Sequence, residues 1–242
     1  IFSAPMVRAL LDGRKTQTRR LLKLAGRSPD YIGPAGCQDD PTCWGWEMPD
    51  LGGYVTIEGD DKDHLPGWRN GWRDWQGAYA PGDRLYVREA FIGPYAYEVN
   101  EYPPRDWGNK AIWFPADGPV PEKHAGQFWH RARPSIHMPR WASRLTLTVT
   151  DVRVQRLQDI SEADAVAEGI QRLIGSKGPN YFTREISGKW SGSFNAPTAA
   201  EVYSDLWNSL HGPGAWDANP WVVALTFTVQ RGNIDQMPGV AG

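Results

Sequence analysis

The first residues that could do chemistry are a lysine and a threonine three positions apart, Lys15 and Thr18. Lys15 lies among Arg14, Arg19 and Arg20, and neighbouring positive charges together with partial burial favour a neutral amine that can act as a base. A hydroxyl within reach of that amine could serve as a nucleophile or orient a water molecule. The alternative is that this basic segment is an ordinary solvated surface.

A helix and a short strand are expected to hold this pair. Ser3 is a typical N-cap, Pro5 suits a first helical turn, and Gly13 suits the position just after a helix. The sequence therefore predicts a helix over residues 4–12, followed by a loop or the start of a strand over residues 14–20.

Three further strands are predicted. A turn before residue 84 introduces a strand over residues 84–91. The clearest strand covers residues 144–157, where apolar and polar side chains alternate until a break at Thr150 and Asp151, which predicts a bulge or a bend. A last strand is predicted over residues 221–229.

Two capping boxes mark helices in the C-terminal half. Ser161 begins a helix that Gly169 ends, and Thr198 begins a second helix that Gly212 ends. Strands and helices do not alternate regularly along the chain, which indicates an α+β fold with a curved or closed sheet.

Two long stretches show no sustained period. Residues 24–80 are rich in Gly, Pro, Trp and Asp, and residues 93–130 are rich in Gly and Pro. We interpret both as loop insertions into a single domain over residues 1–231, with a small hairpin around residues 53–58. The tail over residues 232–242 is predicted to be loose.

Four separated segments resemble the ASCH domain of the PUA-like superfamily, especially the ASCH proteins of phages and prophages. The segments that carry the resemblance are residues 13–19, residues 82–87, residues 134–144 with the strand and helix that follow, and residues 216–221. The resemblance implies a PUA-like β-barrel with flanking short helices and a cleft used for nucleic acid or nucleobases.

Within this group, small enzymes hydrolyse the amide of N4-acetylcytidine with a Lys, a Thr and a Glu. Their Lys-Thr-x-Thr-x-Arg motif matches Lys15, Thr18 and Arg20, and their Glu at a helix end matches Glu168. The resemblance therefore implies an amidohydrolase that acts on N4-acylated cytosine nucleosides, with Lys15, Thr18 and Glu168 as catalytic residues. The alternatives are a module that binds RNA or a modified nucleobase without turnover, and a nuclease.

Five further residues are candidate substrate-binding groups. Arg19 could stabilise an oxyanion, and Glu89 is a second carboxylate near a strand end. His137, Arg140 and Trp141 lie in a basic, turn-rich segment, where an indole could stack on a base and an arginine could bind a phosphate. The alternatives are a salt bridge with a neighbouring arginine for Glu89 and a core position for Trp141.

Composition and net charge narrow the classes of partner that the chain is expected to bind. The chain has 242 residues, is 40% hydrophobic and carries a net charge of −2. This charge argues against a protein that coats nucleic acid, because such proteins need many phosphate-facing cations. A modified cytosine nucleoside or nucleobase, or a short stretch of RNA or single-stranded nucleic acid, is the expected partner.

Metal and membrane sites are not expected. The spacing of the histidines and of Cys37 and Cys43 matches no usual zinc pattern, so we predict neither a metal nor a cofactor. Arg8 and Asp12 interrupt the apolar residues near the start of the chain, so we expect no signal peptide, no membrane span and a cytoplasmic location.

Overall fold

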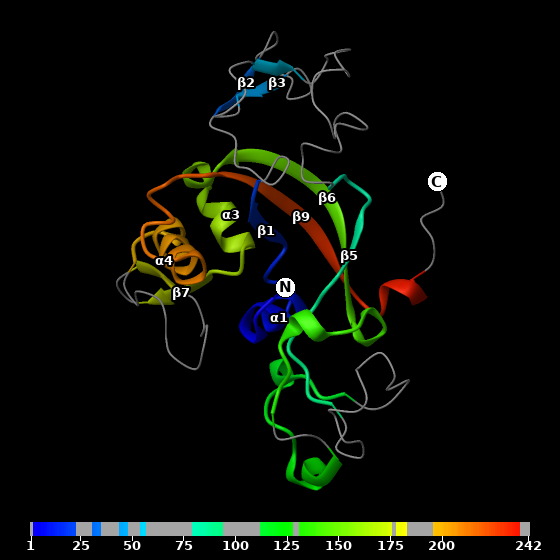
Figure 1. Ribbon diagram of the computed structural model, residues 1–242. Coiled ribbons are helices and arrows are strands. Elements are labelled where there is room, and N and C mark those ends of the chain that lie inside the picture. Colours follow the sequence, from blue (N-terminus) through cyan, green and yellow to red (C-terminus); the bar gives the residue numbers. More distant parts are fainter. Residues whose placement is uncertain are drawn as a thin grey trace.

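The structure is a computed structural model that describes residues 2–22, 31–34, 44–47, 54–56, 79–93, 112–127, 131–175, 178–182 and 196–237. Its main element is a four-stranded antiparallel sheet with the strand order β1-β9-β6-β5. The strands are β1 (Gln17–Leu21), β5 (Arg84–Tyr86), β6 (Leu145–Arg156) and β9 (Trp221–Arg231). Figure 1 shows β6 and β9 as two long, bent strands that run side by side. With its helices, the chain has an α+β fold, as predicted.

The predicted closed barrel is wrong. Within the described residues, β1 and β5 lie at opposite edges of the sheet and do not pair with each other. Closing a sheet requires a hydrogen-bonded ladder between its two edge strands. The edge of β1 that faces away from β9 has no partner strand among the described residues, and we call it the free edge. It is bordered by a cavity, whose other wall includes Tyr79 and Ala90 from the segments that flank β5.

The predicted bulge in the longest strand is confirmed. β6 pairs with β9 from Leu145 to Arg156, and the register shifts between Val149 and Asp151, which leaves Thr150 as the extra residue. The strand predicted over residues 84–91 is shorter than expected: β5 ends at Tyr86, and Phe91 makes only an isolated bridge.

The helices lie where the capping signals predict. They are α1 (Ala4–Leu11), α3 (Glu162–Ala167) and α4 (Ala199–His211). The hydroxyls of Ser161 and Thr198 each accept a hydrogen bond from the backbone N–H three residues later. Gly169 and Gly212 follow their helices with φ angles of +106° and +104°, which favour glycine. Ser3 stands at the N-cap of α1, but its hydroxyl makes no cap hydrogen bond.

Two apolar clusters lie on opposite faces of the sheet. The cluster on the α1 face includes Phe2, Val7, Leu10, Leu145, Leu147, Val223, Leu225 and Phe227. The cluster on the face covered by α3 and α4 includes Leu157, Ala165, Val202, Tyr203, Trp207 and Val222. Consecutive β9 residues thus belong to different clusters, as the twofold side-chain alternation of a strand requires. The sheet is covered on both faces.

Smaller elements complete the described chain. β2 (Tyr31–Pro34), β3 (Trp44–Glu47) and β4 (Tyr54–Thr56) form a separate antiparallel sheet, and β7 (Gln171–Gly175) pairs with β8 (Gly178–Phe182). Short 3-10 helices cover Pro115–Asp117, Glu122–Gln127, Ser135–His137, Arg140–Ala142, Leu157–Asp159 and Ile234–Gln236. Of the hairpin predicted around residues 53–58, the described residues are β4 alone, which pairs upstream with β3.

The predicted loose tail is wrong for its first residues. The side-chain amide of Asn233 donates to the carbonyl oxygens of Arg140, Trp141 and Ser143 at 2.8, 3.0 and 2.9 Å. A 3-10 helix over Ile234–Gln236 follows. The chain is therefore fixed against the body of the domain up to Met237, and residues 238–242 lie outside the described residues.

Candidate functional site

Two of the three predicted catalytic side chains meet in the interior. Lys15 lies between α1 and β1, and Glu168 is the C-cap residue of α3, 153 positions later. The Lys15 Nζ donates to the Glu168 Oε2 at 2.7 Å and to the Glu168 backbone carbonyl at 2.8 Å. Both residues are buried, with exposed fractions of 1% and 5%. The fold thus builds a buried ion pair from distant parts of the chain.

The surroundings of Lys15 differ from the expected cluster of positive charges. Arg14 turns to the surface, where its Nη2 donates to Asp12 at 2.9 Å, and Arg20 is exposed. A carboxylate and a helix C-terminal carbonyl surround the Lys15 ammonium instead, and both stabilise a cation. Lys15 must therefore pass a proton to an acceptor before it can act as a base, and Glu168 is the carboxylate in contact with it.

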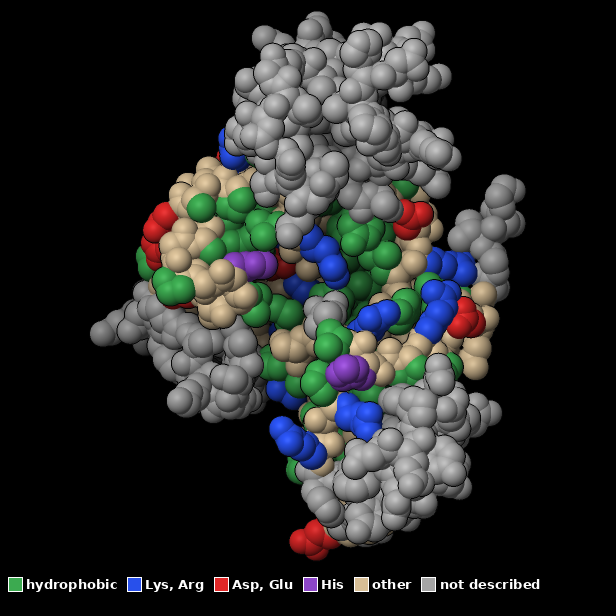
Figure 2. Space-filling view, viewed as in Figure 1, with side chains coloured by type: hydrophobic (Ala, Val, Ile, Leu, Met, Phe, Trp, Pro, Cys, Tyr) green, Lys and Arg blue, Asp and Glu red, His purple; other side chains and the backbone are tan. Residues whose placement is uncertain are grey.

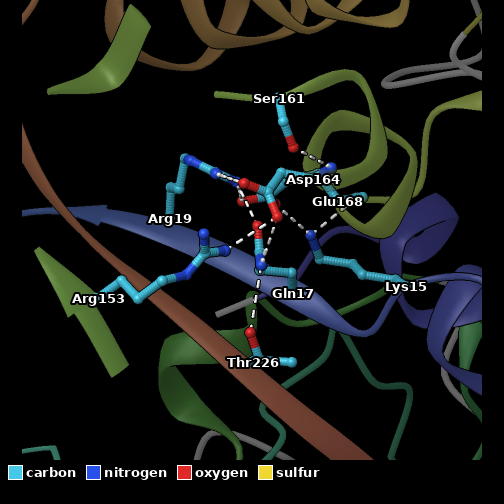
Figure 3. A network of polar contacts seen from close by, with 8 residues as sticks. All are labelled: Lys15, Gln17, Arg19, Arg153, Ser161, Asp164, Glu168 and Thr226. Atoms are coloured by element: carbon cyan, nitrogen blue, oxygen red, sulfur yellow. Dashed lines mark hydrogen bonds and ion pairs between the residues drawn. The ribbon is translucent and has the colours of Figure 1, made fainter. Parts of the chain in front are cut away.

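Arg19 binds the same carboxylate from the other side, as Figure 3 shows. Its Nη1 donates to the Glu168 Oε1 at 3.2 Å and to the Gln17 Oε1 at 2.6 Å, while its Nη2 donates to the Asp164 Oδ2 at 3.0 Å. Its side chain is fully buried. The predicted oxyanion role for Arg19 is not what the geometry favours, because both terminal nitrogens already bind protein oxygens. Arg19 instead orients Glu168.

Asp164 is a fixed negative charge in this network. Burial alone would raise the pKa of Asp164, but hydrogen bonds from Arg153 and Gln17 and the charges of Arg153 and Arg19 lower it to about 2. The Arg153 Nη2 donates to Asp164 at 2.9 Å and the Gln17 Nε2 at 3.1 Å. Asp164 therefore stays ionised at neutral pH and neutralises Arg19, whatever the protonation state of Glu168.

A cavity of about 810 Å³ opens beside this buried pair. Its lining includes Lys15, Thr18, Arg19 and Glu168, together with residues of α1, β1 and α4. In Figure 2 a hollow on this face has hydrophobic side chains along its walls and Lys or Arg side chains around it. Its volume lies in the range of about 300–1,000 Å³ that is typical of small-molecule sites.

Thr18 lines the same cavity, but its side chain lies on the face of β1 opposite to that of Arg19. It is partly buried and pairs with Leu225 of β9, whereas Arg19 points to α3. Among the described contacts, no hydrogen bond joins the Thr18 hydroxyl to Lys15 or Glu168. The three predicted catalytic residues therefore share a cavity, and a ligand would have to connect the hydroxyl with the ion pair.

The α4 wall of the cavity adds the aromatic residues Tyr203, Trp207 and His211, which the sequence analysis did not name as site residues. Burial raises the pKa of Tyr203 well above its usual value, and the nearby charge and hydrogen bond of Glu168 raise it further, so the phenol is neutral. Trp207 stacks on His211 with ring centroids 4.1 Å apart. Partial burial lowers the pKa of His211, which favours the neutral imidazole.

Glu89 is not part of the cavity. Arg144 binds it through Nε at 2.8 Å and Nη2 at 2.9 Å, and the carboxylate is buried. Burial raises the pKa of Glu89, although the hydrogen bond and charge of Arg144 oppose that shift. Glu89 thus takes the structural role of a salt bridge with a neighbouring arginine, and its predicted substrate-binding role is not supported.

His137, Arg140 and Trp141 do not line the cavity either. His137 is exposed, and Arg140 pairs at the surface with Asp235. Trp141 packs against a small apolar cluster that includes Phe91. Their segment approaches the cavity only through Pro134 and Ser135. Trp141 is partly buried, and its packing favours the core alternative over stacking on a base.

The described residues hold neither a cluster of metal ligands nor a membrane-spanning helix. Within the described ranges, no three or more His, Cys, Asp or Glu side chains are grouped so that they could bind a metal ion. None of the described helices combines the length and apolar character needed to cross a bilayer. Cys37 and Cys43 lie outside the described residues.

Comparison of this chain with protein-family models, curated proteins and solved structures finds no match. The resemblance to ASCH proteins therefore rests on the four sequence segments alone.

Proposed function

We propose that this protein is a PUA-like, metal-independent amidohydrolase that acts on N4-acylated cytosine nucleosides, with Lys15, Thr18 and Glu168 as its catalytic residues. The observation that carries the proposal is the buried Lys15–Glu168 pair at a cavity that also exposes Thr18. Taking two charges out of water costs several kcal/mol per ion, and paired titratable groups in a cleft are typical of functional sites.

The proposed reaction begins with a proton transfer inside the ion pair. Lys15 gives a proton to Glu168, and the resulting amine takes a proton from the Thr18 hydroxyl or from a water molecule. The activated oxygen attacks the acyl carbonyl, the carbon–nitrogen bond breaks, and Glu168 returns its proton to the departing exocyclic amine. Attack by Thr18 gives an acyl ester that water then hydrolyses. The products are a carboxylic acid and the free cytosine nucleoside.

Arg19 and Tyr203 support these steps without reacting. Arg19 holds the Glu168 Oε1, which leaves Oε2 directed at Lys15. The neutral Tyr203 phenol beside Glu168 can stabilise that carboxylate by hydrogen bonding. General acid–base assistance of this kind contributes about 10²–10⁴ in rate.

The proposal is tested by incubating the protein with N4-acetylcytidine and following the loss of the acyl-cytosine absorbance. Lys15→Met is expected to abolish turnover, because no other amine contacts Glu168 among the described residues. Arg14→Met is the matched control, since it removes the neighbouring cation, which pairs with Asp12 at the surface. Circular dichroism checks that both variants remain folded. Equal turnover by the two variants would exclude the mechanism.

A second candidate is a module that binds a modified nucleobase or RNA without turnover. It is favoured by the two acceptors that already hold the Lys15 ammonium and by the lack of a described hydrogen bond from Thr18 to either partner. A gel-shift assay with short RNA and single-stranded DNA separates the candidates. Retardation without any loss of N4-acetylcytidine supports the binding module, and hydrolysis without retardation supports the enzyme.

A further inference from the structure

The free edge of β1 presents main-chain groups to the cavity. The strand is an edge of the sheet and pairs only with β9 among the described strands. The Phe227 N–H donates to the Thr16 carbonyl and the Leu22 N–H donates to the Trp221 carbonyl, and these two pairs continue the β1–β9 register by one residue at each end. Even-numbered residues of β1 therefore turn their main-chain polar groups to β9.

The odd-numbered residues must then point the other way. In an antiparallel pair, residues with hydrogen-bonded partners alternate with residues whose N–H and C=O face outward. Arg19 and Leu21 are opposite Ala224 and Val222 at these alternate positions. Their N–H and C=O groups thus face away from β9 and have no ladder partner within the described residues.

The cavity reaches around this edge. Thr18 and Arg20 are opposite Leu225 and Val223, members of the apolar cluster on the α1 face, whereas Arg19 contacts α3 on the other face. Residues of both faces of β1 line one cavity. Because β9 closes the other edge, a single cavity can touch both faces only by passing the free edge.

Apolar side chains flank the edge on its two sides. Leu206 and Trp207 of α4 line the cavity on one side, and Phe2 and Tyr79 line it elsewhere in the wall. A group that binds main-chain N–H and C=O at a strand edge lies in the plane of the sheet, so these side chains would meet its flat faces. Aromatic and apolar faces stack well on planar rings.

We propose that the main chain of Arg19 and Leu21 binds a flat heterocycle that carries an adjacent hydrogen-bond donor and acceptor, as a pyrimidine base does. This inference rests on the proposed function for the identity of the cavity as the ligand site. It adds that main-chain groups recognise the ring by hydrogen bonding. The side chains of the buried pair then carry out the reaction. An extended peptide could also add to a strand edge, but a cavity of about 810 Å³ that ends at buried charges fits a small molecule better.

Substitution by proline isolates a single main-chain N–H. Leu21→Pro removes an N–H that faces the cavity and leaves the ladder to β9 complete, a position where strands tolerate proline. Leu21→Ala removes the same side chain but keeps the N–H. Arg20→Pro removes an N–H that faces β9 in the β1–β9 register. It therefore tests whether the even-numbered residues of β1 are the ones bonded to β9. Binding of uridine and cytidine is measured by calorimetry, with the thermal unfolding midpoint of each variant.

The expected result is that Leu21→Pro binds the nucleosides about tenfold more weakly than Leu21→Ala, since the ligand acceptor loses its donor. Arg20→Pro should lower the unfolding midpoint and Leu21→Pro should not. 3-Methyluridine, which lacks the ring N–H, should bind more weakly than uridine. If Leu21→Pro does not fold, an ester in place of the Leu21 amide bond removes the same N–H.

Equal binding by Leu21→Pro and Leu21→Ala overturns the inference, as does binding of a strand-forming hexapeptide when neither nucleoside binds. N4-acetylcytidine hydrolysis is assayed on the same samples. If Leu21→Pro and Leu21→Ala change turnover equally, the proposed main-chain contact is rejected and the hydrolase proposal stands. If only Leu21→Pro weakens nucleoside binding and the protein shows no turnover, the hydrolase proposal is rejected and the main-chain contact stands.

Discussion

At the scale of residues, the candidate site is a series of linked ion pairs, and the stability of the protein depends unequally on its members. Glu168 accepts from Lys15 and Arg19, and Arg19 also binds Asp164. Removal of one member leaves its neighbours either still paired or isolated in the interior. An isolated buried charge is costly, so the position of a residue in the chain of contacts determines the effect of replacing it.

Glu168→Gln should therefore destabilise the protein more than Lys15→Met. The first change leaves the buried Lys15 ammonium without a carboxylate and Arg19 with Asp164 alone, and it should cost about 3–5 kcal/mol of unfolding free energy. The second leaves the Arg19–Glu168 contact in place and should cost less. Urea denaturation measures both values, and equal losses would show that Arg19 does not support Glu168.

The stability of the protein should depend on Asp164 in acid. Its pKa of about 2 lies below the ordinary value of 3.8, so its ion pairs stabilise the fold above pH 4 and lose that effect as the pH falls through 2. Asp164→Asn should cost about 1 kcal/mol near pH 6, after allowance for solvent screening, progressively less as the pH falls below 4, and nothing well below pH 2. Chemical denaturation over this range tests it, with Asp217→Asn as the exposed control. Parallel pH curves for wild type and Asp164→Asn would contradict it.

Sequence patterns predicted the types of these side chains better than their partners. The resemblance related Lys15 to Glu168, and the structure brings them together. Arg19 was misjudged because its role depends on α3 packing on β1, which no local pattern reports. One signal was present: Asp164 and Glu168 are four residues apart on a predicted helix and so share a face.

At the scale of elements, α3 fixes the start of α4 as well as the site. The Glu162 carboxylate accepts hydrogen bonds from the backbone N–H groups of Ala199 and Ala200 at 2.7 and 3.1 Å. These are first-turn groups of α4 that have no partner inside the helix. The helix that supplies Glu168 thus also caps the helix that supplies the aromatic wall of the cavity.

Glu162→Ala should lower the unfolding free energy by about 1 kcal/mol, because two N–H groups at a helix start lose a charged acceptor. Glu201→Ala is the matched control: it removes an acid from the first turn of α4 itself, and no hydrogen bond to its side chain is described. Thermal unfolding of both variants checks the difference. A larger loss for the control would contradict the inter-helix cap.

At the scale of the whole molecule, local sequence signals predicted the helices and strands well but did not predict whether the sheet closes into a barrel. The capping boxes and the alternation in β6 place three elements because these patterns involve neighbours in sequence. Whether β1 meets β5 depends on strands far apart in the chain, and the cavity lies beside the free edge of β1. Asn233 makes the same point, since its three carbonyl partners lie about 90 residues upstream.

The extra residue Thr150 in β6 affects the ion pairs of the candidate site, because it determines which face of the sheet the following side chains occupy. Val152 and Val154 pack against the same apolar cluster as Leu145 and Leu147, although strict alternation would have turned them to the opposite face of the sheet. The extra residue resets this parity and at the same time sends Arg153 to the opposite face, where it reaches Asp164. A strand one residue shorter would direct a guanidinium into the apolar interior and leave an aspartate without its cation, so an insertion or deletion here would be felt at the cavity without any change in its lining.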